Sequence, residues 1–376
     1  MPVPYLPLEL ISLILTELRL SCCEDDAIRR ANGLSAALVC RSWKPLGVGV
    51  VWHRIKIEQS KEAERFLAHF DEYPQHACLV KEMVVEGCGD EVWAAEPLDE
   101  CSKFIARLFR ACPRVSTASL RSNGWFDAGR CVQHMAAHPA PFLQHFAVDI
   151  TVLSFSLFTL FYHCSAFVDL RSLELRVLIV RPLVGSATPR RAPRLLPLAK
   201  LFMRLPFSTL EPFLVIDDLL SRVDPATLRA IDISLPTAGD VLWQRLASLP
   251  ALRTLSFLTT AEPNPLPAFA SLLPHLPSFQ TLFRLVIVFH GDSTPPPAPS
   301  SQLTVRSFLD AIPLGLLVAV VGGLDLPLGN VESVDWSPMR HPGMCGVASM
   351  RITNDIESTS FYRVKMADGT SDWFRE

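Results

Sequence analysis

The sequence predicts an α/β protein in which a small, all-helical N-terminal segment is followed by an irregular solenoid of parallel strands and convex helices. Three observations predict this fold. A six-position apolar pattern, L-x-x-L-x-L, recurs along most of the chain and marks short strands. Helical stretches that stop at a proline separate several of these strands. The 376 residues also exceed what a single core usually holds, which favours a repeat array or two modules.

The composition excludes several classes of protein. Apolar residues make up 49 % of the chain and the mean hydropathy is +0.27, which is incompatible with wholesale disorder. The net charge of −3 provides no global basic field, so we expect no nucleic-acid partner and no membrane partner. The ten cysteines include no C-x-x-C pair, and no basic region of a signal peptide follows Met1. We therefore expect reduced thiols and a cytoplasmic or nuclear protein.

Two uncharged apolar stretches resemble membrane spans at first sight. Residues 151–168 contain several serines and threonines, and residues 311–324 are shorter than the roughly 20 residues that a spanning helix needs. We interpret both stretches as buried helices of a large fold.

The first element is a helix over residues 6–18, with Pro7 in its first turn. At 100° per residue, its apolar positions from Leu8 to Leu18 cover roughly 220° of the helical wheel. A helix of a small domain needs an apolar stripe of only about 100°. Either a partner protein or the rest of this chain must cover the excess.

A second helix is predicted over residues 34–46, ending at Pro45, and a strand follows over residues 51–57. The motifs L-P-x-E-L-x-x-x-I-L, L-V-C-R-S-W and V-W-x-x-I-x-I follow one another in residues 6–57. In this order they resemble an F-box, most closely those of F-box proteins of mushroom-forming fungi. Residues 19–33 depart from that family, because the spacer is longer and more polar than usual and the middle helix is poorly defined.

The resemblance implies a function for residues 1–57. F-box domains bind the Skp adaptor of a cullin–RING ubiquitin ligase, and the remainder of the chain presents a substrate for ubiquitin transfer. Trp43 fits either the adaptor contact or the internal core. The adaptor-binding residues that the resemblance implies are Leu6, Pro7, Leu10, Leu13, Ile14, Leu38, Val39 and Trp43.

The next segment, residues 58–345, carries the repeated pattern. Its clearer instances are Val80-Met83-Val85, Val115-Ala118-Leu120, Leu143-Phe146-Val148, Leu170-Leu173-Leu175, Leu228-Ile231-Ile233, Leu252-Leu255-Phe257 and Leu282-Leu285-Ile287. Weaker instances are Leu210-Phe213-Val215, Val331-Val334-Trp336 and Val347-Met350-Ile352. Cys88 and Asn123 occupy the small polar position after the first two strands, and residues 102–112 and 240–249 fit the helices between strands.

These features resemble divergent leucine-rich repeats, whose parallel strands line a concave surface. Residues 181–206 interrupt the pattern with a cluster of basic residues. We interpret them as a solvated loop or an irregular repeat, and a docking patch for an acidic partner is the alternative. Outward-facing charges of the concave surface form the predicted substrate-binding set, namely Arg171, Glu174, Arg229, Asp232 and Arg253.

Residues 346–376 change in character. Residues 349–353 and 361–366 alternate apolar and polar side chains, which predicts a hairpin that caps the open end of the solenoid.

The sequence gives no sign of catalysis. No phosphate-binding, dinucleotide-binding, zinc-protease or nucleophile-elbow motif occurs, so we expect no enzyme and no cofactor. Cys131, His134 and His138 would share one helical face, but ordinary helix residues are favoured over a zinc site because the spacing is no established zinc signature. Two hypotheses remain: a substrate receptor of a Skp–cullin–F-box ligase that binds an unidentified protein, or a non-catalytic scaffold outside ubiquitin transfer.

Overall fold

The computed structural model describes most of the chain between Leu10 and Arg375. The described residues are 10–11, 13–14, 16–17, 26–39, 41–86, 98–122, 128–139, 141–153, 157–180, 195–204, 220–234, 240–259, 272–289, 312–313, 316–321, 344–353, 358–366 and 371–375. They form two compact units. The first comprises Met1–Leu170 with Arg181–Pro193, and the second comprises Arg171–Val180 with Arg194–Glu376.

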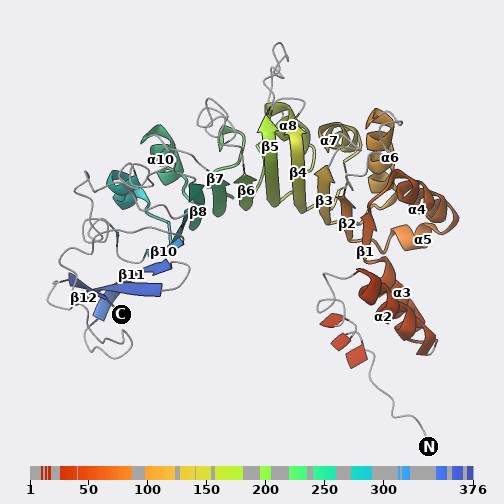
Figure 1. The fold of residues 1–376 in the computed structure, drawn as a ribbon, viewed down its shortest axis with the longest axis horizontal. Coiled ribbons are helices and arrows are strands. Elements are labelled where there is room, and N and C mark those ends of the chain that lie inside the picture. Colours follow the sequence, from red (N-terminus) through yellow and green to blue (C-terminus); the bar gives the residue numbers. More distant parts are fainter. Residues whose placement is uncertain are drawn as a thin grey trace, which may run out of the picture. The chain divides into compact units, whose positions relative to one another are not determined.

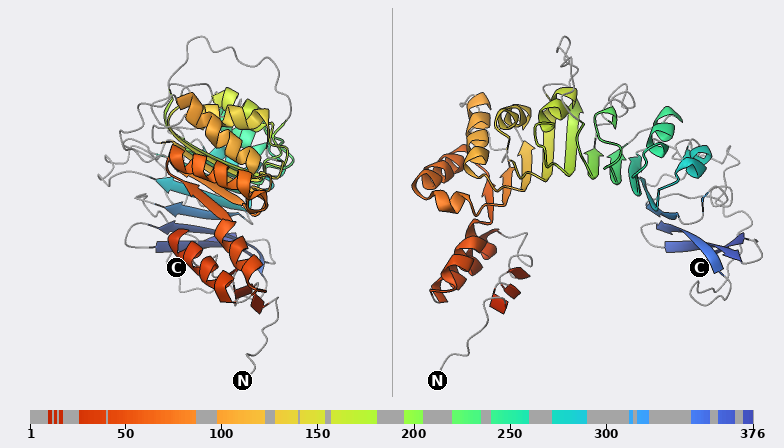
Figure 2. Two further views of the ribbon diagram at one scale, coloured as in Figure 1. Left: turned by 90° about the vertical axis from the view of Figure 1, so that its right-hand side faces the viewer. Right: turned by 180° about the vertical axis from the view of Figure 1, so that it is seen from behind.

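The first unit begins with helices. The described residues between 10 and 17 are helical, and α2 (Asp26–Val39) and α3 (Lys44–Trp52) follow and pack side by side (Figures 1 and 2). The prediction of a helix ending at Pro45 was wrong, since Pro45 lies in the first turn of α3, where its missing N–H costs no hydrogen bond. Helix α2 instead begins inside the expected polar spacer.

A parallel sheet with helices on one side completes the first unit. Its strands are β1 (Arg54–Ile57), β2 (Glu82–Glu86), β3 (Thr117–Ser122) and β4 (His145–Leu153), each paired in parallel with the next. The helices are α4 (Ser60–Glu72), α5 (Pro74–Ala77), α6 (Leu98–Ala111), α7 (Ala128–Ala137) and α8 (Leu157–Cys164). Figure 1 shows α6 and α7 on the same side of these strands. The strand predicted over residues 51–57 begins only at Arg54 and belongs to this sheet.

The second unit continues the same architecture. Parallel pairing runs in sequence through β5 (Ser172–Val180), β6 (Lys200–Arg204), β7 (Ala230–Ser234), β8 (Thr254–Thr259), β9 (Arg284–Phe289), β10 (Leu317–Val321) and β11 (Met344–Thr353). Helix α10 (Asp240–Ala247) and the 3₁₀ helix η2 (Leu273–Ser278) lie between strands. The predicted C-terminal hairpin is confirmed: β12 (Ser358–Met366) pairs antiparallel with β11, and β13 (Ser371–Arg375) adds a further strand.

The apolar repeat pattern forms the core of both units. Every residue of the seven clearer instances is at most 7 % exposed. One repeat was missed: Leu198, just before β6, and Leu201 and Met203 within it are equally buried, and Leu198 lies 28 residues after Leu170. Residues 200–204 of the basic 181–206 segment therefore form a strand, in agreement with the interpretation of an irregular repeat. Among the weaker instances, the one at 347–352 lies in β11, and those at 210–215 and 331–336 lie outside the described residues, as do Cys88 and Asn123.

Neither apolar stretch is a single buried helix. Residues 151–153 end strand β4 before α8 begins, and β10 occupies the middle of residues 311–324. Strand β10 buries Val318 but leaves Leu317 37 % exposed, and a short apolar run of this kind cannot be told from a buried helix by its pattern alone. None of the helices in the described part of the chain is long and apolar enough to cross a membrane.

Candidate functional site

Large apolar side chains are exposed at the N-terminus of the first unit. Half of the fourteen exposed large apolar residues in the described part of the chain lie between residues 10 and 39, and the others are scattered between residues 73 and 317. We call these seven residues the apolar surface: Leu10, Leu13, Ile14, Ile28, Leu34, Leu38 and Val39. Large exposed apolar patches mark interaction sites, whereas apolar residues that are scattered singly over a surface need no such explanation.

Helix α2 supplies most of this surface, and it exposes apolar residues while it buries a charged one. At 100° per residue its exposed residues cover an arc of roughly 140°, and within that arc only Ser35 is polar. Ala27, Ala31, Leu34 and Leu38 follow a 4-3-4 spacing, which is typical of a seam against another helix. Leu38 is 86 % exposed, whereas Arg29 on the opposite face is 1 % exposed. The apolar face of α2 is thus turned away from its own chain.

Small residues hold α2 against α3. A Cβ atom on Gly47 would lie 2.5 Å from the carbonyl oxygen of Gly33 and 2.5 Å from the backbone nitrogen of Ala37. Only glycine permits this approach, which puts the two helix backbones in contact. Ile11, Ala36 and Val50 form the small buried cluster next to this crossing.

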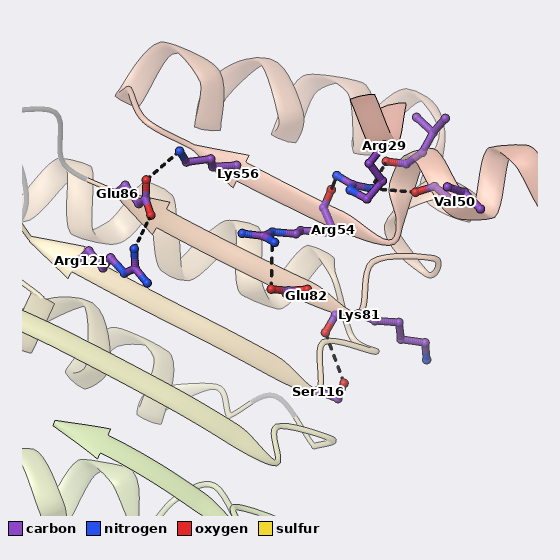
Figure 3. A network of polar contacts seen from close by, with 10 residues as sticks. Arg29, Val50, Arg54, Lys56, Lys81, Glu82, Glu86, Ser116 and Arg121 are labelled. Atoms are coloured by element: carbon purple, nitrogen blue, oxygen red, sulfur yellow. Dashed lines mark hydrogen bonds and ion pairs between the residues drawn. The ribbon is translucent and has the colours of Figure 1, made fainter. Parts of the chain in front are cut away.

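The buried Arg29 ties α2 to the end of α3 and the start of the sheet (Figure 3). Its Nη1 donates to the carbonyl oxygens of Val50 at 2.7 Å and Val51 at 3.3 Å, and its Nη2 donates to that of Arg54 at 2.7 Å. The last carbonyls of a helix lack partners within the helix, and a cation there also interacts favourably with the helix dipole. One guanidinium therefore fixes the orientation of the helix that carries most of the apolar surface.

The predicted adaptor-binding residues fall into three groups. Leu10, Leu13, Ile14, Leu38 and Val39 are exposed and belong to the apolar surface. Trp43 is half-buried and packs on the small cluster, so the alternative of an internal role describes it better. Leu6 and Pro7 lie outside the described residues.

Sequence reasoning missed two members of the apolar surface, Ile28 and Leu34. The 4-3-4 spacing that begins at Ala27 was the signal available for α2. It was overlooked because residues 19–33 were interpreted as a polar spacer.

A second candidate surface lies on the sheet of the second unit and contains the predicted substrate-binding residues. Arg171, Arg229 and Arg253 are exposed and each directly precedes a strand. Glu174 and Asp232 lie half-buried within β5 and β7. The register places Glu174, Phe202 and Asp232 in one row across β5, β6 and β7.

The two acidic residues of this surface are paired with arginines that sequence reasoning missed. Glu174 Oε1 accepts a hydrogen bond from Arg176 Nε at 2.8 Å, and Asp232 Oδ1 lies 3.3 Å from Arg204 Nη2. Both guanidinium groups lie over the ring of Phe202, at 5.2 Å for Arg176 and 4.8 Å for Arg204. Burial raises the pKa of Asp232, and the charge of Arg204 opposes that rise. The missed strand β6 provides Phe202 and Arg204, so recognising its repeat would have found them.

An open groove borders the same sheet at the beginning of strands β7–β9. It has a volume of about 680 Å³. The lining residues are Ala226, Arg229, Pro250, Ala251, Arg253, Thr281 and Phe283. Two cations, an exposed aromatic ring and several small apolar side chains therefore face one space.

Charged side chains also pair across the strands of the first unit (Figure 3). Glu86 pairs with Lys56 at 2.8 Å and with Arg121 at 2.9 Å, and Arg54 pairs with Glu82 at 3.5 Å. Hydrogen bonds to Glu58 and Glu86 raise the pKa of Lys56 far above its usual value. These pairs link neighbouring strands.

The geometry gives no support to the zinc alternative. Cys131 is buried in the core side of α7, while His138 is exposed beyond the end of that helix. Within the described ranges, no three histidine, cysteine, aspartate or glutamate side chains are placed to share a metal ion.

The fold and the two surfaces describe a solenoid-like α/β protein whose prominent features are suited to binding. No known protein family and no curated protein matches this chain.

Proposed function

We propose that the chain is the substrate-recognition subunit of a Skp–cullin–F-box ubiquitin ligase. The apolar surface of residues 10–39 binds the Skp adaptor, which connects the chain to the cullin scaffold. The sheet of the second unit binds a protein substrate. In this role the chain positions other proteins and performs no catalysis itself.

The exposed apolar face of α2 is the observation that supports this proposal best. A short helix whose buried face consists of Arg29, Gly33 and Ala36 leaves its leucines in water. Fully burying one leucine side chain is worth about 1.5–3 kcal/mol. Leu34 and Leu38 together therefore contribute several kcal/mol to binding a partner helix, and the F-box-like motifs in residues 6–57 point to the adaptor as that partner.

The test uses the full chain with a purified Skp adaptor. Leu38→Asp should weaken adaptor binding by more than about 100-fold, because it removes apolar contact and buries a charge without a partner. Val241→Asp is the matched control, since Val241 on α10 is 71 % exposed and lies in the other unit. Circular dichroism should show both variants folded. Equal adaptor binding by wild type and Leu38→Asp would remove the basis of the proposal.

Co-purification of cullin separates the two hypotheses for this chain. A substrate receptor should bring down the cullin together with the adaptor. A scaffold outside ubiquitin transfer should bring down at most the adaptor.

A further inference from the structure

Five successive strands of the second unit each begin with an exposed cation. Arg171, Arg229 and Arg253 directly precede β5, β7 and β8, and Lys200 and Arg284 are the first residues of β6 and β9. We call these five residues the cationic row. The substrate-binding set predicted from the sequence includes Arg171, Arg229 and Arg253. Lys200, on the missed strand β6, and Arg284 complete the row.

The backbone ladder fixes the spacing of this row. Arg229 N donates to Ala199 O at 2.9 Å, Arg253 N donates to Arg229 O at 2.8 Å, and Arg284 N donates to Arg253 O at 2.9 Å. The register places Arg171, Arg229 and Arg253 level with one another, whereas Lys200 and Arg284 lie one residue further along their strands. Neighbouring strands lie about 4.8 Å apart, so the five strands span roughly 19 Å. An extended segment of about six residues covers the same length.

No acidic residue in the described part of the chain neutralises this row. Glu174 on β5 and Asp232 on β7 already form ion pairs with Arg176 and Arg204. The Asp224 carboxylate accepts a hydrogen bond from Ala226 N and forms no ion pair with the row. Among the described residues, the five cations therefore form a local positive field on a chain whose net charge is −3.

The groove beside the row adds an apolar contact to this charge. Arg229 and Arg253 belong to the row and also line the groove, next to Phe283, Pro250 and Ala251. Phe283 itself is 58 % exposed. Closely spaced arginines bind carboxylates through paired hydrogen bonds, and an apolar wall accommodates an adjacent side chain.

We infer that the cationic row binds an extended acidic segment of a protein partner, with several aspartates or glutamates and one apolar residue seated against Phe283. The segment crosses the starts of β5–β9 and contacts them through side chains, because the strand backbones already pair with one another. The inference rests on the proposed function only in that this segment would belong to the ubiquitination substrate.

The experiment measures binding of a fluorescein-labelled octapeptide of alternating aspartate and glutamate with one central phenylalanine. Arg229→Glu with Arg253→Glu in the full chain should weaken binding at least about tenfold, because two attractive contacts become repulsive. The matched control is Arg110→Glu with Arg114→Glu, which changes the net charge equally at exposed positions of the first unit. The control should bind the peptide as the wild type does, and a Phe283→Ser variant should bind more weakly.

Three results would overturn the inference. They are absence of peptide binding by the wild type, equal loss in both charge-reversed variants, and tighter binding of a single-stranded oligonucleotide than of the peptide. Adaptor binding is measured on the same samples. If the peptide fails to bind while the adaptor binds, the substrate class is wrong and the proposed function stands. If the peptide binds while the adaptor does not, the proposed function is wrong and the chain is an acidic-peptide receptor outside the ubiquitin system.

Discussion

The contact between α2 and α3 allows a quantitative test, because α3 contains two glycines in opposite situations. A Cβ on Gly47 would lie 2.5 Å from two backbone atoms of α2 and 2.9 Å from the Cα of Ala37, whereas a Cβ on Gly49 would meet nothing within 4 Å. Both residues are interior to the same helix, so Gly→Ala brings the same gain in helix propensity at each, about 1 kcal/mol. The two variants differ only in sterics.

The steric cost at Gly47 outweighs that gain. Atoms at 2.5 Å must separate to about 3.5 Å, and backbone atoms of α2 cannot rotate away as a side chain can. Moving α2 by about 1 Å also stretches the hydrogen bonds of Arg29, and overpacking of this kind usually costs about 1–3 kcal/mol or more. After the gain in helix propensity is subtracted, we expect Gly47→Ala to destabilise the helix pair by about 1–2 kcal/mol and Gly49→Ala to stabilise it by about 0.5–1 kcal/mol.

Native-state hydrogen exchange of the α3 amides measures this difference locally, without requiring the whole chain to unfold in one step. Protection of the amide at residue 47, which donates to Trp43 O at 2.9 Å, should fall in Gly47→Ala and rise in Gly49→Ala. Equal or greater protection in Gly47→Ala would refute the close packing of α2 on α3.

Three further predictions concern other parts of the described chain. Arg29→Met should destabilise the first unit by about 3–5 kcal/mol in urea unfolding, because it leaves several carbonyl oxygens without their charged donor. Arg30→Met on the same helix is the control and should change the free energy of unfolding by less than about 0.5 kcal/mol. Burial and the neighbouring His69 lower the pKa of His76, so the unfolded chain binds the proton at a higher pH than the folded chain does. The stability that is present above pH ~6.5 should therefore be lost as the pH falls through that value. His76→Phe should flatten the decline of Tm between about pH 7.5 and 5.5. Burial raises the pKa of Cys112 and of Cys164 to about 12, so at about pH 8 a maleimide should label neither thiol in the native chain, as mass spectrometry of the labelled peptides would show.

The expected pH dependence has a structural basis in the stacking around Trp52. His69 and His76 stack on the Trp52 ring at 4.5 and 5.2 Å between centroids, and His69 Nε2 lies 2.9 Å from His76 Nδ1. One of these nitrogens must accept the proton of the other, so the contact fails when both rings are charged. His163, whose pKa burial also lowers, leaves a residual slope in the His76→Phe variant. A profile that is unchanged in that variant would contradict this assignment.

The repeat pattern predicted most of the sheet because it reports a physical requirement. Each strand must bury three apolar side chains against the layer of helices, so the spacing L-x-x-L-x-L recurs wherever a strand of the sheet forms. The repeat at Leu198, Leu201 and Met203 satisfies the same requirement, but four prolines and several arginines precede it, and this composition fits a loop as well as an irregular repeat. Local composition is a weaker signal than the apolar spacing within it.

Helix boundaries near Pro45 could not be decided from the residue type alone. Proline both ends a helix that precedes it and starts a helix that follows it, and the choice depends on whether residues 41–43 form a turn. They do, and the N–H of Gly47 then bonds to Trp43 O in the first turn of α3. This turn lets α3 fold back on α2, which only the tertiary structure reveals.

The burial of Arg29 and the exposure of the leucines explain why the exposed face of α2 was only partly predictable. Sequence reasoning assigns apolar residues to a protein's own core, and it assigned the polar residues 19–33 to a solvated spacer. In α2 the long polar residue Arg29 is buried because it satisfies helix-end carbonyls, and the leucines are exposed because Gly33 and Ala36 already fill the contact with α3. Burying Leu34 and Leu38 within the unit instead would separate the backbones at Gly47 and leave the carbonyls of Val50 and Arg54 without Arg29. Packing against α3 and packing through the leucines therefore exclude each other, so the described residues of this unit leave both leucines exposed.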